Sequence, residues 1–346
     1  MKRRLLFTTS LLVAGLLAAT ALCSWMNRAS LIPEESIERA AAKSFLILQQ
    51  SGYRFITGRP EKCASCHHNT LTSMVAELAG RKGIPGIDSF TLNRVQAMER
   101  MIYTTTNPNA VTKFVAANFG PPYILLGLYA EKYPANPYTD IAVDYLMSQA
   151  RPDGGFITES GRPPLETGEI HLAATSIRAI QLYASPAKQA HVEALVARCR
   201  QWLEKARPEE QQELAFQLLG LYWCGGDASR IKEVAQKLVS LQNADGGWSQ
   251  MPTLRSDAYA TGQALYTLFE SGMVKPDDPL YQKALNYLLS TQDESGGWIV
   301  ETRAYPIQPF INSGFPPYDE NQFISAAGTN WAAMALLNAL PEKVTK

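Results

Sequence analysis

A short motif recurs at three places where a predicted helix ends. Gln149, Gln242 and Gln292 each close an apolar helical segment, and two glycines and an aromatic residue follow within seven residues. Paired glycines permit a left-handed turn, so the aromatic side chain can return onto the preceding helix. The glutamine side chain can then hydrogen-bond the backbone of the next helix. The copies are unevenly spaced, which predicts a drifting repeat of helical hairpins. The aromatic residues are Phe156, Trp248 and Trp298.

Apolar residues recur at helical spacing through most of the chain. Ile37, Phe45 and Leu48 begin this pattern on a helix that starts near Ser36. No stretch shows the alternation of a half-buried strand. The sequence therefore predicts an all-α protein with a helix content well above the usual third. Further helices are predicted at about residues 69–81, 89–102, 123–133, 138–149, 169–184, 188–206, 210–224, 229–242, 257–272, 279–291 and 323–340, with the start of another near 111–117.

The helix–Gln–x–x–x–Gly–Gly–Trp pattern resembles the Gln-Trp repeats of the squalene–hopene cyclases and of the wider terpenoid cyclase and protein prenyltransferase superfamily. The resemblance implies an α/α toroid, in which helical hairpins form two concentric rings around a central apolar cavity. It covers roughly residues 36–340, and residues 27–346 are expected to form this one domain. The chain also resembles exported bacterial cyclase-like proteins through residues 63–68 and 308–325. A shared fold does not by itself imply a shared activity.

The acid that starts cyclisation in hopene cyclases is replaced here. Those enzymes protonate a double bond with an aspartic acid of an Asp-x-Asp-Asp-Thr-Ala motif, and residues 257–262 are the most similar stretch. Asp257 and Thr261 are kept, whereas Tyr259 and Ala260 replace the two following acids. A tyrosine cannot protonate an alkene. Asp257 is also suited to cap the helix that follows it, so the pattern argues against acid-initiated cyclisation.

A zinc site of the prenyltransferase type is not supported by the spacing of the soft ligands. His171, His191, Cys199 and Cys224 are available, but they show no recognisable metal-ligand spacing. Cys199 and Cys224 lie in or next to apolar helical segments. They are predicted to be buried, inert thiols.

The strongest functional motif is the run from Cys63 to His67. Two cysteines three residues apart, with a histidine directly after the second, are the pattern of covalent c-type haem attachment. Cys63 and Cys66 would form the thioethers, and His67 would ligate the haem iron. Two alternatives stay open, namely a Cys63–Cys66 dithiol or disulfide and one half of a zinc site.

A second axial ligand would have to come from another segment. His68 is adjacent to His67 and cannot reach the opposite face of the same iron. Met74 lies about two helical turns along the same face, which makes it a poor candidate. His171, Met98 and Met101 are the remaining candidates, and each is equally suited to ordinary core packing.

The first 26 residues have the pattern of an export signal. Lys2 to Arg4 are basic, residues 5–22 are uncharged and rich in leucine and alanine, and residues 19–21 offer a small-x-small cleavage site. The alternative is an uncleaved membrane anchor, since the apolar run is long enough to span a bilayer. We expect a periplasmic protein, or one held at the outer face of the inner membrane. The net charge of zero predicts no nucleic-acid partner.

The segment from Ala304 to Gln322 is rich in proline and lacks a helical period. Long segments of this kind inside compact domains are often lids or binding loops. Tyr305, Phe310, Phe315 and Tyr318 are predicted to cover one mouth of the toroid, and a packed connection is the alternative.

Together these features lead to three functional hypotheses. The first is an exported toroid that carries covalent haem c and either transfers electrons to a redox partner protein or uses the haem to handle a small apolar ligand in the central cavity. The second is a cyclase-like enzyme, or a protein that binds an isoprenoid or other small apolar ligand in the central cavity without haem. The third is a non-catalytic interaction scaffold that uses the rim of the toroid.

Overall fold

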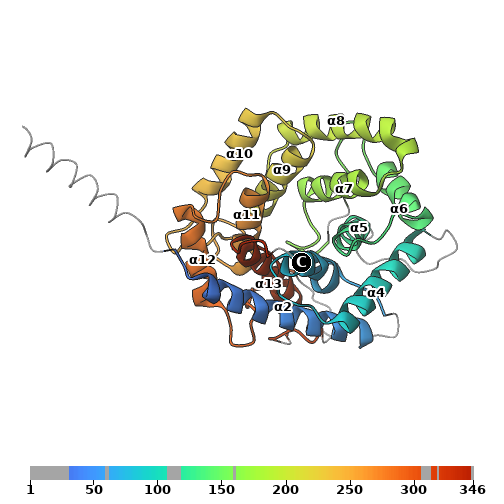
Figure 1. Cartoon of the computed structure of the whole chain (residues 1–346). Coiled ribbons are helices and arrows are strands. Elements are labelled where there is room, and N and C mark those ends of the chain that lie inside the picture. The colour runs from blue at the N-terminus through green and yellow to red at the C-terminus, as the bar shows by residue number, and fades with distance from the viewer. Residues whose placement is uncertain are drawn as a thin grey trace, which may run out of the picture. The chain divides into compact units, whose positions relative to one another are not determined.

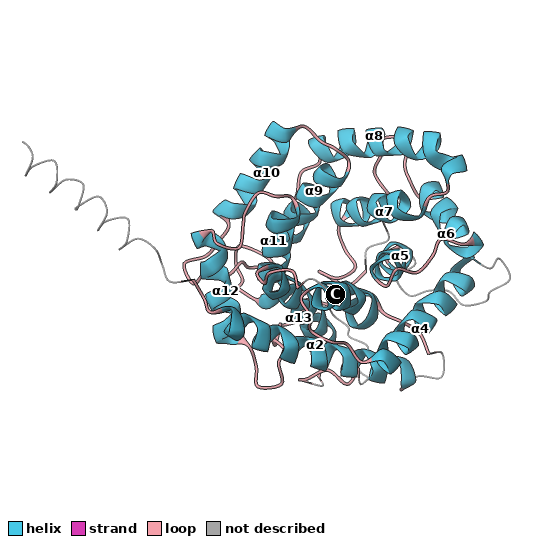
Figure 2. Ribbon diagram, in the orientation of Figure 1, coloured by secondary structure: helices cyan, strands magenta, loops and turns pink. Residues whose placement is uncertain are grey.

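The computed structural model describes residues 31–58, 62–106, 118–158, 161–304, 313–317 and 319–343. Contacts divide the chain after Pro33, and Glu34–Lys346 form one compact unit, which is described here by itself. The described part of the chain is helical and contains no named strand (Figure 2). Its helices are α2 (Glu34–Thr57), α3 (Leu71–Arg81), α4 (Asp88–Thr106), α5 (Gly120–Ala130), α6 (Pro137–Ser148), α7 (Glu169–Tyr183), α8 (Gln189–Lys205), α9 (Gln211–Trp223), α10 (Ala228–Ser240), α11 (Ala258–Glu270), α12 (Pro279–Thr291) and α13 (Gln322–Asn338), with short π and 3-10 turns at Cys66–Thr70 and Pro186–Lys188.

The helices form two concentric rings, which Figure 1 shows end-on. The inner ring contains α3, α5, α7, α9, α11 and α13. Each inner helix packs against the next, and α13 packs against α3, which closes the ring. The even-numbered helices lie outside and pack against the inner helices that flank them. This arrangement confirms the predicted all-α class and the predicted α/α toroid.

Sequence pattern separates the two rings. The outer helix α10 buries a single stripe, formed by Ile231, Val234, Ala235 and Leu238. The inner helix α13 is buried on all sides, with Phe323 as its one residue that is not buried. A helix that is apolar or small on every face must lie inside a protein. Helix α13 therefore reveals its inner position by lacking an amphipathic period.

The repeated motif closes the hairpins as predicted in two of its three copies. The Trp248 and Trp298 indole nitrogens donate to the carbonyl oxygens of Leu238 and Leu288 on the preceding helices, at 2.7 and 2.9 Å. The Gln242 side chain donates to the Leu280 carbonyl at the start of α12, at 3.0 Å. These bonds tie each hairpin to its neighbour.

The copy at Gln292 also closes the ring. Its amide donates to the Ala40 carbonyl and to the Ser44 hydroxyl of α2, both at 3.0 Å. Gln149 differs, because among the described residues its side-chain amide donates to the adjacent Ser148 hydroxyl, at 3.2 Å, and not to a following helix. The glycines at 154, 246 and 296 all have φ between 93° and 99°, so each turn is left-handed as expected.

The predicted helices agree with the structure within a few residues, and two starts differ. A π turn, Cys66–Thr70, precedes α3, and its N-cap Ser65 accepts the His68 backbone N–H. Helix α5 begins at Gly120, so Pro121 and Pro122 lie in its first turn, where their missing N–H groups cost nothing. The helix start expected near 111–117 and the export signal lie outside the described residues. Within the described residues, no helix is long and apolar enough to cross a membrane.

Candidate functional site

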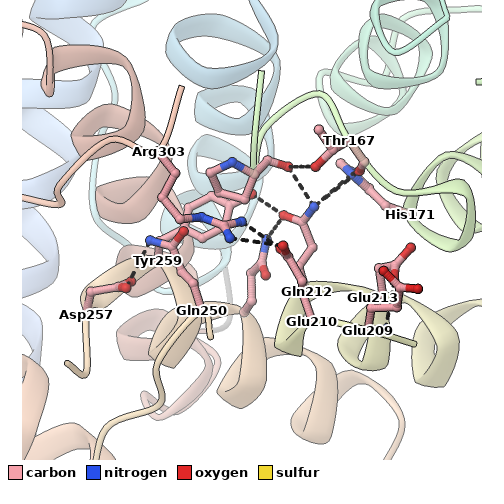
Figure 3. Close-up of polar contacts among 12 residues, drawn as sticks. Thr167, His171, Glu209, Glu210, Gln212, Glu213, Gln250, Asp257, Tyr259 and Arg303 are labelled. Carbon is pink, nitrogen blue, oxygen red and sulfur yellow. Dashed lines mark hydrogen bonds and ion pairs between the residues drawn. The ribbon is translucent and has the colours of Figure 1, made fainter. Parts of the chain in front are cut away.

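The amino-terminal ends of the inner helices carry a network of buried polar side chains (Figure 3). Gln212, in the first turn of α9, is its centre. The Tyr259 hydroxyl donates to Gln212 Oε1, and the Gln263 amide donates to the same oxygen at 3.3 Å. Gln212 Nε2 donates to the Pro164 carbonyl at 2.7 Å. The network therefore links α9 and α11 to the loop before α7.

His171 connects this network to α5. Its Nδ1 lies 3.1 Å from the Thr167 carbonyl oxygen and 3.2 Å from Gln212 Nε2, and its Nε2 lies 2.7 Å from the Tyr123 hydroxyl. Burial lowers the pKa of His171 to about 4, so the ring is neutral at physiological pH. Both ring nitrogens are occupied by protein groups. His171 therefore acts here as a structural link rather than as a free ligand.

Asp257 is the N-cap of α11. Its Oδ1 accepts the Ala260 backbone N–H at 2.9 Å, and its Oδ2 accepts from Gln250 at 3.0 Å. Burial raises the pKa of Asp257 to about 6. The sequence is consistent with Asp257 both as the retained acid of the cyclase motif and as a helix cap, and the structure shows the helix cap.

Tyr259 occupies the position of the replaced acid and is almost fully buried. Burial raises the pKa of its hydroxyl further above the ordinary value for tyrosine, so the group stays neutral. The hydroxyl is used to donate to Gln212. This end of the inner ring thus offers neutral hydrogen-bonding groups where an acid-initiated cyclase needs a strong acid.

Two paired acids flank the network. Arg303 binds both carboxylate oxygens of Glu210, at 3.0 and 2.6 Å. Arg162 likewise binds both oxygens of Glu166, at 2.8 and 2.7 Å. Bidentate pairs of this kind fix the geometry of both side chains. They leave these carboxylates committed to structural contacts.

The Cys63–His67 motif reaches the same end of the ring. Cys66 is half-buried, and its thiol interacts electrostatically with Tyr123 and Tyr259. Burial raises the pKa of the Cys66 thiol to about 12. The thiol is therefore protonated at neutral pH and is a weak nucleophile, which disfavours a redox-active dithiol. No disulfide joins Cys63 and Cys66 in this structure.

His67 lies on the wall of a small cavity. Its ring is 5.1 Å from that of Phe323, and its Nδ1 contacts His68 Nδ1. The cavity holds about 30 Å³, space for roughly one water molecule, so a haem does not fit beside His67 without displacement of its neighbours. The cavity is lined by His67, Arg162, Pro163, Leu165, Glu166, Thr302, Ala304, Glu320, Phe323 and Ile324. Haem attachment stays a prediction.

The three candidate axial ligands have different surroundings. Met101 lies against the motif, because its sulfur accepts the Ala64 backbone N–H at 3.1 Å. Met98 is fully buried, and its sulfur lies close to Gly127 of α5. His171 is bound in the polar network described above. Of the three, Met101 is the one that the structure places directly against the motif.

No group of three or more potential metal ligands occurs among the described residues. Cys199 and Cys224 are buried as predicted. Of the four aromatic residues expected to form a lid, Phe315 is fully buried and lies against Gly297, so it belongs to a packed connection. Tyr305, Phe310 and Tyr318 lie outside the described residues.

A larger pocket lies at the opposite, carboxyl-terminal ends of the inner helices. It holds about 660 Å³, within the range of small-molecule sites. Trp223 and Glu270 end α9 and α11 there, so the pocket is about 18 Å along α9 from Gln211. Its wall is mostly apolar and aromatic, with charged groups among it. The lining residues are Met74, Glu77, Leu78, Arg81, Leu126, Tyr129, Ala130, Lys132, Tyr133, Arg178, Leu182, Trp223, Tyr266, Phe269, Glu270, Met334 and Asn338.

Aromatic rings occupy the space between the two ends. The His171 ring is 4.2 Å from that of Phe216, which is 6.1 Å from that of Trp331, which is in turn 5.4 Å from that of Tyr266. These residues come from α7, α9, α13 and α11. Phe216 on α9 and Trp331 on α13 meet although α11 separates their helices in the ring. The rings therefore form an aromatic column from the polar network to the pocket.

Solved structures of known proteins identify this architecture. The type II terpene cyclase MstE from Scytonema superposes with a TM-score of 0.60 at 14% identity, over 90% of this chain and 99% of that one. This chain has the α/α toroid fold of the terpene cyclases. A variant of the Scytonema enzyme in complex with geranylgeranyl dihydroxybenzoate, its substrate, gives a TM-score of 0.59 at 14% identity, over 89% of this chain and 98% of that one.

Sequence comparisons point to terpene cyclases over shorter stretches. A squalene–hopene cyclase from Bradyrhizobium diazoefficiens is 32% identical over 101 residues, which are 26% of this chain and 14% of that enzyme. A drimenyl diphosphate synthase from Streptantibioticus cattleyicolor is 28% identical over 172 residues, or 44% and 30% of the two chains. The chain thus spans less than a third of the length of the curated relatives it matches. No family profile matches the chain.

Several site residues were not singled out from the sequence. Gln212 and Tyr123 form the network at one end, and Arg178 and Tyr266 line the pocket at the other. One signal was present, because Gln212 is a polar residue in a helix that is buried on nearly every face. Buried polar side chains need partners, so such residues mark places where helices are joined.

Proposed function

We propose that the protein binds a small apolar ligand of isoprenoid type and does not cyclise it by acid-initiated chemistry. The observation that carries this proposal is the pocket of about 660 Å³ at the carboxyl-terminal ends of the inner helices. Leu78, Leu126 and Met334 supply apolar contacts, and Tyr266 and Phe269 supply aromatic ones. Pockets of this size and lining are typical of small-molecule sites.

Two further observations support binding without cyclisation. Tyr259 replaces the acid that a hopene cyclase would use, and its hydroxyl is committed to Gln212. Asp257 caps α11 with the carboxylate oxygen that accepts from Ala260. The prenylated substrate named for the Scytonema neighbour makes an isoprenoid the ligand class to test first.

The test is lipid extraction of the purified protein followed by mass spectrometry, together with binding of farnesol measured by tryptophan fluorescence. Leu126→Trp should fill the pocket and abolish farnesol binding, because Leu126 is on its wall. Leu92→Trp is the matched control, because Leu92 is 60% exposed. Equal binding by both variants would rule out this pocket, and a cyclised product from squalene would overturn the non-cyclising assignment.

The second candidate function is covalent haem binding with a redox role. Its supporting observation is that no disulfide joins Cys63 and Cys66, with His67 next in the chain and the Met101 sulfur against Ala64. Bound haem would supply one-electron redox chemistry. Cys63, Cys66 and His67 would hold it, and a redox partner protein and an extracytoplasmic location would follow from it.

Expression with haem-attachment machinery tests this second candidate. A chromophore that survives acid-acetone extraction is expected from the natural sequence and from Cys199→Ala, and it should be lost in Cys63→Ala. A colourless protein under these conditions would exclude haem c. Fractionation of cells that produce the full chain would show in addition whether the protein is exported.

A further inference from the structure

The wall of the pocket at the carboxyl-terminal ends carries two polar groups for which the described residues provide no hydrogen-bond acceptor. Arg178 makes no hydrogen bond or ion pair within the described residues, and it is held over the Trp223 ring with its Cζ 5.4 Å from the ring centroid. The Tyr266 hydroxyl likewise has no hydrogen-bond partner in the described part of the chain. Both side chains are half-buried on the pocket wall. A half-buried guanidinium and hydroxyl without protein acceptors are available to donate to a bound molecule.

Both groups are hydrogen-bond donors. Arginine cannot accept a hydrogen bond. Burial raises the pKa of Tyr266, so its hydroxyl remains protonated and able to donate. Arg178 and Tyr266 also lie near enough to interact electrostatically. The pocket therefore presents two donors on one wall, with the Glu270 carboxylate also near Tyr266.

The other charges on the wall largely cancel. Arg81 pairs with Glu77 at 3.0 Å and with Glu342 at 3.3 Å. Lys132 is exposed, and Glu270 is the one lining carboxylate for which the described residues provide no ion pair. The inner helices also end here, and their partial negative charge offsets part of the basic charge. The wall is thus close to neutral, and Arg178, Tyr266 and Glu270 are among the polar groups of the lining for which the described residues provide no ion pair or side-chain hydrogen bond.

Resting on the proposed apolar-ligand function, we infer that the ligand is an amphiphile whose head carries acceptor oxygens, a carboxylate or a ketone. The head oxygens accept from the Arg178 guanidinium and the Tyr266 hydroxyl. The tail lies along Leu78, Leu126 and Met334. A cationic or purely donating head leaves both protein donors unmatched and places a second positive charge beside Arg178.

A series of ligands with one tail and three heads tests this inference. Dodecanoate, 2-dodecanone and dodecylammonium are titrated against the full chain below their micelle concentrations, and binding is followed by isothermal calorimetry. Dodecanoate or 2-dodecanone should bind on the order of 10-fold more tightly than dodecylammonium, because a charge-assisted hydrogen bond is worth about 1.5–3 kcal/mol. If dodecanoate binds and 2-dodecanone does not, the head group is a carboxylate. If dodecanoate and 2-dodecanone both bind, a carbonyl oxygen is sufficient.

Two conservative variants locate the head. Arg178→Met keeps an unbranched side chain and removes the donors, and Tyr266→Phe removes only the hydroxyl. Each should weaken dodecanoate binding several-fold or more without changing the melting temperature by more than a few degrees. Arg39→Met is the control, because the Arg39 side chain is 63% exposed on α2.

The outcomes separate the two proposals. If all three ligands bind equally, or if Arg178→Met has no effect, the head assignment is wrong while the apolar pocket stands. If dodecylammonium binds most tightly, the head assignment is likewise wrong. If no ligand binds and Leu126→Trp changes nothing, the proposed function itself fails.

Discussion

At the residue scale, Tyr259 has a structural role in the inner ring. Tyr259 stands where the resemblance to hopene cyclases places an acid, and its hydroxyl belongs to a neutral network with Gln212. A catalytic acid must be exposed to its substrate and be ready to lose a proton. Tyr259 is buried and holds its proton more tightly than usual. The position has therefore become part of the connection between α9 and α11.

Asp257 gives a pH-dependent prediction. Its pKa is about 6 in the folded protein against an ordinary value of 3.8, so the folded state binds its proton more tightly than the unfolded state. Its contribution to stability is therefore present below about pH 4 and is lost as the pH rises through 6. Asp257→Asn keeps the capping oxygen and never ionises. We expect it to raise the free energy of unfolding by on the order of 2 kcal/mol at pH 7.5 and by little at pH 4.

Urea unfolding of both proteins between pH 4 and 8 measures this difference. His171 has a lowered pKa and acts in the opposite direction, losing stability as the pH falls. It is present in both proteins, so it cancels in the comparison. Asp257→Ala should be less stable than Asp257→Asn by about 1 kcal/mol through loss of the cap. A difference between wild type and Asp257→Asn that does not vary with pH would contradict the assignment.

At the element scale, the glutamine of the repeat stabilises the fold to an extent that depends on which groups its side chain hydrogen-bonds. Gln292→Ala removes bonds to Ala40 and Ser44 on α2 and to the Gly296 carbonyl. We expect a loss of about 1–3 kcal/mol in the free energy of unfolding, because buried acceptors lose their donor. Gln149→Ala is the matched variant and should cost less than about 0.5 kcal/mol, since Gln149 bonds only Ser148. Equal losses in chemical denaturation would show that ring closure does not depend on this contact.

Close helix packing gives a second prediction at this scale. A Cβ at Gly262 of α11 would lie 2.4 Å from the Trp331 backbone of α13, which is closer than atoms can approach. Gly262→Ala should therefore destabilise the fold by about 2 kcal/mol or more, through forced separation of the two helices. Gly80→Ala on α3 meets nothing within 4 Å and should stabilise by about 0.5–1 kcal/mol. Melting temperatures of the two variants should move in opposite directions, and a shared direction would contradict this packing.

At the scale of the whole molecule, stability depends on a closed ring. Helix α13 packs against both α11 and α3, and it is buried on nearly every side. A chain that ends at Asn321 would expose the apolar faces of both neighbours. We expect this truncated chain to lose its cooperative thermal transition and to bind a hydrophobic dye. Removal of residues 1–33 should change the melting temperature by no more than about 2 °C, because they form a separate unit. A cooperative melt of the truncated chain near the full-length temperature would show that the ring tolerates opening.

Much of the fold could be predicted from the sequence, because it depends on local patterns. The helical spacing of apolar residues located the helices, and the Gly-Gly-Trp turns located the ends of two hairpins. The role of Gln242 and Gln292 also followed from their position after a helix. Gln149 shows the limit, since the same motif there finds no partner on a following helix. Whether a side chain bridges two hairpins depends on the distance between them, and that distance is set by the ring.

The candidate sites divide in the same way. The Cys63–His67 motif, the replacement of the acid by Tyr259 and the capping position of Asp257 could be recognised from the sequence alone, because each depends on residue types at a short spacing. Only the tertiary structure brought Tyr123, His171, Gln212 and Tyr259 together from four helices, and Arg178 and Tyr266 to one pocket wall. These residues are far apart in the chain, and no periodicity relates them. Burial also determines the pKa values and the hydrogen-bond partners of these groups, because the neighbours of each group come from helices all around the ring.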